Sequence, residues 1–469
     1  MTGLVVHNAE LYGRAGTDVR IAGGVIAEIG RGLTARRGEE LLDARGGALL
    51  PGLCDHHVHL HAMAMAARSV HCGPPTITGL AALAEALARA PIDEYGWVRG
   101  VGYTEDVAGP LDAAALDRLH AARPVRIQHR GGSLWVVNTA AAQALGLVHA
   151  DHPGVERDAM GRPTGRLWRA DSWLRTRLPP SRPPGLGGVG GRLARLGITH
   201  VTDATPDLDA TAIGAIGDDM RTGALPQRVQ LLGAPLSWAD PGEPDAPTAG
   251  PHKIVIADSR LPALDDLTER VHAAHNADRA VAVHCVTREA LVLLVAVLER
   301  TGTHAGDRIE HAALIPVELI GRLRELGTAV VTQPGFLADR GDDYLRDVPA
   351  DDHTDLYRVR SLLDGGVACA FSSDAPYGPA DPWAVIDAAA HRRTRAGRVA
   401  GPAERLTADR ALDAYLGAPE NPGGPPRPIA PHAPADLVLL RAPRARALAR
   451  PSADLVAATV IAGAVVWAQ

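Results

Sequence analysis

Eight short runs rich in valine, isoleucine, leucine and alanine alternate with segments of helical composition through the middle of the chain. The intervening segments are rich in alanine, leucine, arginine and glutamate, which favour helices. Strands that alternate with helices pair in parallel, and eight such units close into a TIM-type barrel. The runs are Ala48–Leu53, Thr199–Asp203, Val229–Leu232, Lys253–Ala257, Ala280–His284, Arg308–His311, Ala329–Thr332 and Ala368–Ser372. This alternation predicts an α/β protein with a (β/α)8 barrel.

The two ends of the chain carry a different pattern. Residues 1–48 alternate apolar and polar side chains around a Gly23-Gly24 turn, and residues 425–469 contain two further short apolar runs. Both patterns are typical of short antiparallel strands. Neither end alone makes a convincing domain, and chain termini often lie close together. We therefore expect residues 1–48 and 425–469 to form one small composite β-sandwich domain.

The remaining residues, 49–424, are assigned to the barrel. The connection after the first barrel strand, at about residues 62–198, is far longer than the others. Structureless loops of that length are uncommon in compact domains. We therefore expect a large inserted subdomain at about 62–198.

Composition excludes several classes of partner. A net charge of −6 and an aromatic content of 3% provide neither a basic surface nor stacking platforms for nucleic acid. Four cysteines in 469 residues make no disulfide framework, and the N-terminus has no signal-peptide pattern. The longest apolar run, around Leu291 to Leu298, is too short to cross a membrane. We expect a cytoplasmic protein that binds a small-molecule substrate and, if it assembles, forms a homodimer.

Side chains that can bind a metal stand at the ends of several runs. Alternate residues of a strand share a face, so His57 and His59 project together while His56 points the other way. The carboxyl ends of barrel strands meet at one mouth, where barrel active sites lie. Further runs end in residues of the same kind, namely His284, His311 and Asp374. The sequence therefore predicts that these side chains converge.

Lys253 is the only lysine among the 48 basic residues of the chain. A guanidinium stays protonated, whereas a buried lysine amine can lose its proton. A neutral amine can then act as a nucleophile, or take up carbon dioxide and become a carbamate, which is a carboxylate-like metal ligand. The alternative is a chance survivor whose stem packs on apolar surface with the head in water. The neighbouring strand-end histidines favour the chemical interpretation.

The stretch Pro51-Gly52-Leu53-Cys54-Asp55-His56-His57-Val58-His59, followed by strand-end histidines and an aspartate, resembles the amidohydrolase superfamily of metal-dependent hydrolases. The closer resemblance is to the amidohydrolase-3 type branch that includes N-substituted formamide deformylases. It covers nearly the whole chain and is carried by Trp135-Val136-Val137-Asn138, Gly161-Arg162-Pro163-Thr164-Gly165, Arg308-Ile309-Glu310-His311-Ala312, Ser373-Asp374-Ala375-Pro376 with Asp381-Pro382, and Ala435-Asp436-Leu437-Val438 with Gly463.

The resemblance implies a binuclear metal centre. Two divalent ions, with zinc expected and manganese or iron as alternatives, would be bridged by a hydroxide and by carboxylated Lys253, which takes its carbamate from carbon dioxide. The metal set implied by the resemblance is His57, His59, Lys253, His284, His311 and Asp374.

The resemblance also places a substrate side, where this chain departs from the branch. Ser133 stands where the branch usually has histidine, Arg169 where glutamate is common, and Asp258-Ser259-Arg260 where Asp-Gly-Ser is usual. Trp135 and Asn138 complete the substrate-binding residues implied. Arginine binds carboxylates through a planar fork, so Arg169 and Arg260 predict an acidic group on the substrate. Solvated surface arginines are the alternative.

The expected reaction is hydrolysis of an amide-like C–N bond by a metal-bound hydroxide, with Asp374 as general base and then general acid. A ring deaminase is an alternative within enzymes, although it needs one metal and no carbamate. A metal-dependent lyase or cyclase of a biosynthetic pathway is another. A metal-binding protein without turnover is disfavoured by the intact Asp374.

Overall fold

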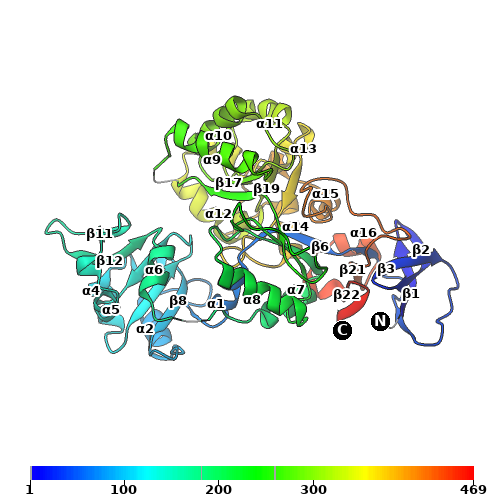
Figure 1. Ribbon diagram of the computed structural model, residues 1–469, viewed down its shortest axis with the longest axis horizontal. Helices are drawn as coiled ribbons and strands as arrows, with labels where there is room; N and C mark the ends of the chain where they lie inside the picture. The colour runs from blue at the N-terminus through cyan, green and yellow to red at the C-terminus, as the bar shows by residue number, and fades with distance from the viewer. Residues whose placement is uncertain (1–2, 181, 258–259) are drawn as a thin grey trace. The chain divides into compact units, whose positions relative to one another are not determined.

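The computed structural model describes residues 3–180, 182–257 and 260–469. These residues form two compact units (Figure 1). The smaller unit is His61–Pro184, and the larger one joins Met1–Leu60 to Gly185–Gln469. The protein is a mixed α/β structure. None of the described helices is long and apolar enough to cross a membrane.

Parallel strands lie at the centre of the larger unit, in two sheets with the orders β15-β14-β13-β6 and β16-β17-β18-β19-β20. Parallel sheets are usually covered on both faces, which explains the nearly continuous apolar runs. The strand bounds are β6 Leu53–Val58, β13 Ile198–Asp203, β14 Arg228–Leu231, β15 Thr248–Ala249, β16 His252–Val255, β17 Val281–Cys285, β18 Arg308–His311, β19 Ala329–Thr332 and β20 Cys369–Phe371.

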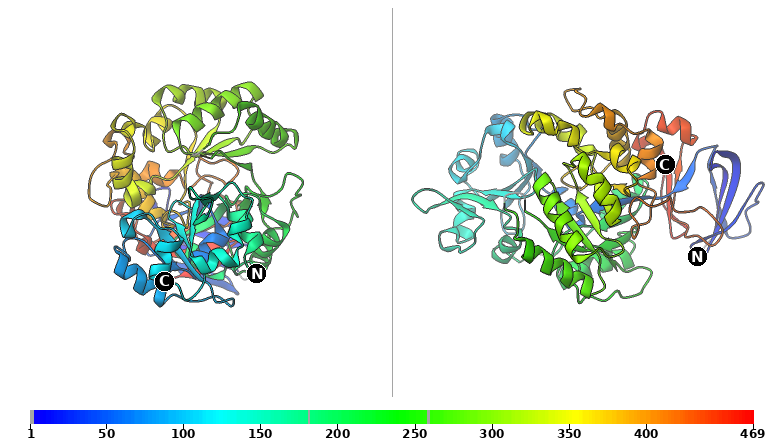
Figure 2. Two further views of the ribbon diagram at one scale, coloured as in Figure 1. Left: turned by 90° about the vertical axis from the view of Figure 1, so that its left-hand side faces the viewer. Right: turned by 90° about the horizontal axis from the view of Figure 1, so that it is seen from above.

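Helices connect these strands and lie on their outer side (Figure 2). Side-chain caps start several of them: Asp209 accepts the backbone N–H of Ala212 at α8, and Thr287 accepts that of Ala290 at α10. The helices are α7 Gly187–Arg195, α8 Ala210–Arg221, α9 Leu264–Asn276, α10 Arg288–Thr301, α11 Ile320–Leu326, α12 Gly335–Asp347, α13 Val359–Asp364, α14 Pro382–His391, α15 Ala408–Asp413 and α16 Arg444–Leu448.

The first of the eight apolar runs differs from the expectation. The pattern predicts one barrel strand over Ala48–Leu53, but the chain forms β5 (Leu49–Pro51), which pairs with β21 (Leu437–Leu440), and then starts β6 at Leu53. Gly52 separates the two strands, and a Cβ at this position would lie 2.2 Å from Cγ2 of Thr199. The parallel strand therefore begins later than predicted. The other seven runs overlap β13, β14, β16, β17, β18, β19 and β20.

The two ends of the chain form neighbouring sheets within the larger unit (Figure 1). One sheet has the order β3-β2-β1-β4 and the other β23-β22-β21-β5. A single apolar cluster holds both together, with Val6, Val19 and Ile26 from the first and Leu437 and Val460 from the second. The bounds are β1 Gly3–Leu11, β2 Arg14–Ala22, β3 Val25–Gly30, β4 Glu39–Asp43, β21 Leu437–Leu440, β22 Val456–Ile461 and β23 Ala464–Ala468.

The smaller unit has its own six-stranded sheet, in the order β11-β12-β10-β9-β8-β7, and two apolar cores. The long connection seen in the sequence therefore folds into a compact subdomain with its own sheet and cores. Its elements are β7 Val70–His71, α2 Leu80–Ala88, β8 Val98–Tyr103, α3 Glu105–Ala108, α4 Ala113–Leu119, β9 Val125–His129, β10 Leu134–Val137, α5 Thr139–Ala144, β11 Val155–Arg157, β12 Pro163–Trp168 and α6 Asp171–Arg177; helix α1, Leu60–Ala66, leads into it.

Candidate metal centre

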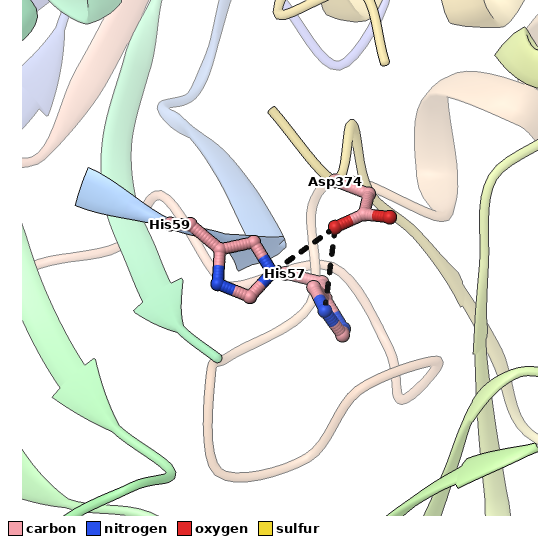
Figure 3. Close-up of side chains that lie close together, drawn as sticks. All are labelled: His57, His59 and Asp374. Atoms are coloured by element: carbon pink, nitrogen blue, oxygen red, sulfur yellow. Dashed lines mark ion pairs between the residues drawn. The ribbon is translucent and has the colours of Figure 1, made fainter. Parts of the chain in front are cut away.

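Three of the predicted ligands come together at the ends of β6 and β20. His57 lies on β6, His59 follows it directly, and Asp374 follows β20. One donor atom from each lies within 4.8 Å of the others. Oδ1 of Asp374 is 3.6 Å from Nε2 of His57 and 3.2 Å from Nε2 of His59 (Figure 3). The face expected for His57 and His59 is confirmed, and His56 instead contacts Cys54.

The other predicted histidines adjoin this group. The ring centroids of His311 and His57 are 4.8 Å apart, and those of His311 and His284 are 4.5 Å apart. Nδ1 of His311 lies 3.9 Å from Oδ2 of Asp374. Lys253 on β16 is buried and interacts electrostatically with Asp374. Side chains from five separate strands thus form one cluster, four of them at strand ends and Lys253 within β16.

Each of three imidazoles is held through its Nδ1 by a side chain outside the cluster. Such outer partners fix the ring orientation and leave Nε2 for a metal. His57 donates from Nδ1 to Oε2 of Glu310, because a buried carboxylate is the acceptor. The remaining pairs are His59 with Oγ1 of Thr205 at 3.1 Å and His311 with Oε1 of Gln333 at 3.0 Å.

The donor atoms fit a divalent cation. Nε2 of His57 and Oδ1 of Asp374 are buried, and among the described residues neither makes a hydrogen bond. Burial lowers the pKa of His57 to about 3, so its imidazole is neutral as a ligand must be. Burial raises the pKa of Asp374, but the 3.2 Å contact with His59 and the electrostatic influence of the His57 and His311 imidazoles outweigh it, and the net shift is downward. Neutral imidazoles with a carboxylate suit zinc, manganese or iron.

Lys253 has the environment that its predicted chemistry needs. Its side chain is buried on β16, and burial lowers its pKa from the usual value, although the carboxylates of Glu310 and Asp374 oppose this effect. A lowered pKa increases the fraction of neutral amine, which is the form that can react with carbon dioxide.

The backbone is strained where the ligands stand. His311 has φ 69° and Ala312 has φ 46°, while Asp374 has φ 53°. Residues other than glycine seldom occupy this left-handed region, and such strain is concentrated at functional sites. Along a regular strand, Glu310 and His311 would face opposite sides. The turn at His311 lets both side chains reach His57.

Glu310 is the outer partner of His57, a role that the sequence analysis did not assign to it. Its side chain is fully buried, with Nε of Arg308 at Oε1 and His57 at Oε2. Arg308 also donates from Nη2 to the carbonyl of His56 at 2.6 Å. Burial raises the pKa of Glu310, but the positive charge of Arg308 and the hydrogen bond from His57 outweigh it and hold the pKa well below its usual value. Glu310 is therefore an anion that orients His57, a predicted metal ligand.

Three further partners of the ligands also escaped sequence reasoning. Thr205 and Gln333 follow β13 and β19, and Asp55 lies on β6. Oδ1 of Asp55 accepts the backbone N–H groups of His57 and Ser373, which ties β6 to the segment that carries Asp374. Burial raises the pKa of Asp55 to about 7. Only Glu310 had a signal in the sequence: a carboxylate two residues after Arg308 on the same strand face.

The predicted substrate residues lie elsewhere in the chain. Ser133, Trp135, Asn138 and Arg169 belong to the smaller unit, and Arg260 to the larger one. Arg169 and Arg260 are exposed, and the backbone N–H of Arg169 donates to the carbonyl of Ser133 at 2.7 Å. Asp258 and Ser259 lie outside the described residues. The roles of Ser133, Arg169 and Arg260 stay predictions.

Asn138 and Trp135 have structural partners. The amide oxygen of Asn138 accepts the N–H groups of Val125 and Ala141, and its nitrogen donates to the carbonyls of His120 and Arg123. These four bonds use every donor and acceptor site of the amide, and the predicted substrate role of Asn138 stays a prediction. The buried indole of Trp135 donates to Asp171 at 2.8 Å; its predicted substrate role stays a prediction.

Comparisons with known proteins found a matching family and several relatives. The model of a family described as the amidohydrolase family matches residues 40–467. The chain is 27% identical to N-substituted formamide deformylase from Arthrobacter pascens, over 87% of this chain and 86% of that protein. It is 25% identical to YtcJ of Bacillus subtilis (strain 168), over 76% and 75%.

A solved structure shares the fold. An uncharacterised metal-dependent hydrolase from Pyrococcus horikoshii OT3 superposes with a TM-score of 0.75 at 20% identity, and the match covers 94% of this chain and 97% of that one.

Proposed function

Since the chain belongs to the amidohydrolase family and is therefore a hydrolase of C–N bonds other than peptide bonds, we propose that it cleaves an amide-like bond of a small molecule with water at the cluster around Asp374. The observation that carries this proposal is the convergence of His57, His59 and Asp374, with donor atoms within 4.8 Å of one another.

We propose that His57, His59, Lys253, His284, His311 and Asp374 hold two divalent ions, most simply zinc. Bound divalent ions would lower the pKa of a water molecule to about 7 and polarise the scissile carbonyl. Lys253 would bridge the ions as a carbamate, formed when its neutral amine adds carbon dioxide and releases a proton. The buried Nε2 of His57 and Oδ1 of Asp374, which make no hydrogen bond among the described residues, support this arrangement.

The protein's own residues would handle the proton. Asp374 lies within 4 Å of three imidazoles and is held as an anion, so it can accept a proton from the attacking water. It would then deliver this proton to the leaving nitrogen, which must be protonated before it departs as an amine. Glu310, Thr205 and Gln333 keep the imidazoles oriented throughout.

We propose that the two parallel sheets form one (β/α)8 barrel. At one edge, Val58 and Ala375 form a parallel bridge, and the N–H of His59 donates to the carbonyl of Ala375 at 2.9 Å. At the other edge, the N–H of Lys253 donates to the carbonyl of Leu232 at 2.9 Å. Such a barrel brings the strand ends that carry the ligands to one mouth.

The domain division predicted from the sequence is retained as part of this proposal. Residues 1–48 and 425–469 would form the β-sandwich, and 49–424 the barrel with an insertion at about 62–198. The shared apolar core of the two terminal sheets supports the first part. The compact unit His61–Pro184 supports the second.

A substrate panel tests the reaction. Protein reconstituted with zinc, manganese or iron is incubated with N-substituted formamides, N-acyl amines and ring amidines, and released amine, formate and ammonia are measured. We expect metal-dependent release of an amine from an acyclic substrate, with oxygen from isotope-labelled water in the acid product. Ammonia from ring amidines alone would indicate a deaminase instead.

Two other outcomes would replace the proposal. A product without the labelled oxygen would indicate a lyase or cyclase. Full metal loading without turnover of any substrate would indicate a metal-binding protein.

A further inference from the structure

Arg340 lies at a break in the helix that follows β19. Helix α12 is irregular at this residue, which has φ −133° and ψ 17°. The side chain is only 12% exposed, whereas Arg346 and Asp347 near the end of the same helix are exposed. Nη2 of Arg340 donates to the carbonyl of Tyr377. The kink thus directs a buried cation toward the segment that follows β20.

That segment is the one that carries Asp374. The N–H of Tyr377 donates to the carbonyl of Asp374 at 2.8 Å, and the ring of Tyr377 lies 5.3 Å from that of His59. Arg340 therefore contacts Tyr377, which in turn contacts two members of the metal cluster, Asp374 and His59. The carboxylate of Asp374 is itself turned toward imidazoles, so it is not the hydrogen-bond acceptor of Arg340.

Burial lowers the pKa of Arg340, but the carboxylates of Asp339 and Asp374 both stabilise its charge, and the net shift is upward for Arg340. Its carboxylate partner is Asp339, with Oδ2 at 3.6 Å from Nε, but Oδ1 of the same carboxylate lies 3.0 Å from Nη2 of Arg395. One carboxylate thus faces two guanidinium groups. Nε of Arg340 is buried and makes no hydrogen bond within the described part of the chain. A buried cation with an unused donor is costly unless an anion completes its environment.

An apolar and aromatic wall adjoins the guanidinium. Its carbon lies 4.1 Å from the centre of the Phe336 ring. Phe336 belongs to a cluster with Ala313 and Tyr357, and the hydroxyl of Tyr357 is 3.2 Å from that of Tyr344. Ala313 follows the ligand His311 by two residues. A cation beside an apolar wall suits a carboxylate attached to a hydrocarbon group.

We propose that Arg340 is a specificity-determining residue that binds a carboxylate of the substrate, with the Phe336 cluster contacting the adjoining hydrocarbon part. The substrate is then an amide-like compound that also carries an acid group, such as an N-acyl amino acid. This inference rests on the proposed function for the position of the scissile bond. It assigns binding of the acid group to Arg340, a largely buried residue of the larger unit, and not to the exposed Arg169 or Arg260.

Matched substrates test the proposal. Wild-type protein, Arg340→Gln, Arg340→Lys and the control Arg346→Gln are assayed with N-formylphenylalanine and with its carboxamide, which share the scissile bond. Arg346 lies on the same helix but is exposed. For the acid, we expect Arg340→Gln to raise KM roughly 10- to 100-fold, the loss of one charge-assisted pair. The carboxamide and the control should show no change, and Arg340→Lys should recover part of the loss.

A binding measurement separates this inference from the proposed reaction. Calorimetry with phenylacetate and phenylacetamide on metal-loaded protein needs no turnover. We expect Arg340→Gln to weaken phenylacetate alone, by roughly 10- to 100-fold. If no amide is cleaved but this loss is seen, the proposed function fails and the role of Arg340 stands.

Three results would overturn the role of Arg340. In the first, phenylacetate does not bind the wild-type protein. In the second, phenylacetate binds Arg340→Gln as tightly as it binds the wild type, which would mean that the metals and not Arg340 bind the carboxylate. Equal losses for the acid and the carboxamide would mean that Arg340 only supports the turn that carries Asp374.

Discussion

Glu310 controls the orientation of His57, because its buried carboxylate accepts the proton of Nδ1. In the Glu310→Gln variant, the neutral amide no longer balances the charge of Arg308. It is also a weaker hydrogen-bond acceptor for Nδ1 of His57. We expect zinc affinity to fall roughly 10- to 100-fold, the usual effect of removing an outer partner of a metal-binding histidine. Breaking the buried pair should also cost about 3–5 kcal/mol of stability.

Zinc transfer to a chromophoric chelator measures this affinity on the folded fraction. Glu318→Gln is the control, since Glu318 is exposed and follows the same strand. If the two variants retained zinc equally, Glu310 would have no part in orienting the ligand.

Asp374 combines two roles that one substitution can separate. Asp374→Asn keeps the shape but cannot accept a proton, so kcat should fall by roughly 10²–10⁴-fold, the usual contribution of a general acid–base group. Metal content must be measured in the same preparation, because Asp374 is also a predicted ligand. Turnover near the wild-type value with metal retained would remove Asp374 from proton transfer.

Lys253 gives the sharpest test of the carbamate. Arginine replaces lysine everywhere else in this chain, yet Lys253→Arg cannot form a carbamate and should lose metal and activity as fully as Lys253→Ala. Bicarbonate should aid metal loading of the wild type only, and short carboxylic acids should partly restore Lys253→Ala. A fully active Lys253→Arg with normal metal content would show that the single lysine is an accident of composition.

At the scale of elements, the sequence predicted which residues lie at the strand ends but not the side-chain contacts between neighbouring strands. The two-residue period of a strand placed His57 and His59 on one face, and the structure confirms it. Thr205 and Gln333 could not be found, because their contacts depend on cross-strand register, which no local pattern encodes. The early start assigned to the first barrel strand has the same cause, since the close approach of Gly52 to Thr199 joins distant parts of the chain.

Gly52→Ala tests this joint. The added Cβ would lie 2.2 Å from Cγ2 and 2.3 Å from Oγ1 of Thr199, so β6 and β13 must move apart. Overpacking of this kind costs about 1–3 kcal/mol. We expect a lower urea midpoint and weaker zinc binding, because β6 carries His57. Gly188→Ala on α7, where no atom lies within 4 Å of the added Cβ, should instead be neutral or stabilising. Equal midpoints for both variants would contradict this account.

The chain forms two compact units, and the predicted metal ligands lie in one of them. The smaller unit has its own sheet and cores, and its Asn138 is fully used in holding backbone. The metal cluster, Glu310 and Arg340 all belong to the larger unit. Substitutions in the smaller unit should therefore act on substrate preference or stability rather than on metal content. The homodimer and the cytoplasmic location stay predictions.

Metal binding should stabilise the larger unit as a whole, because the predicted ligands come from both ends of its strand succession, β6 and β20. Free metal at 100 times its dissociation constant adds about 2.7 kcal/mol to stability. Chelation should therefore lower the melting temperature, and zinc or manganese with bicarbonate should restore it as elemental analysis approaches two ions per chain. A stoichiometry that stays at one ion per chain under all these conditions would contradict the proposal that Lys253 bridges two ions. An unchanged melting temperature after complete chelation would contradict the proposal that metal binding stabilises the larger unit.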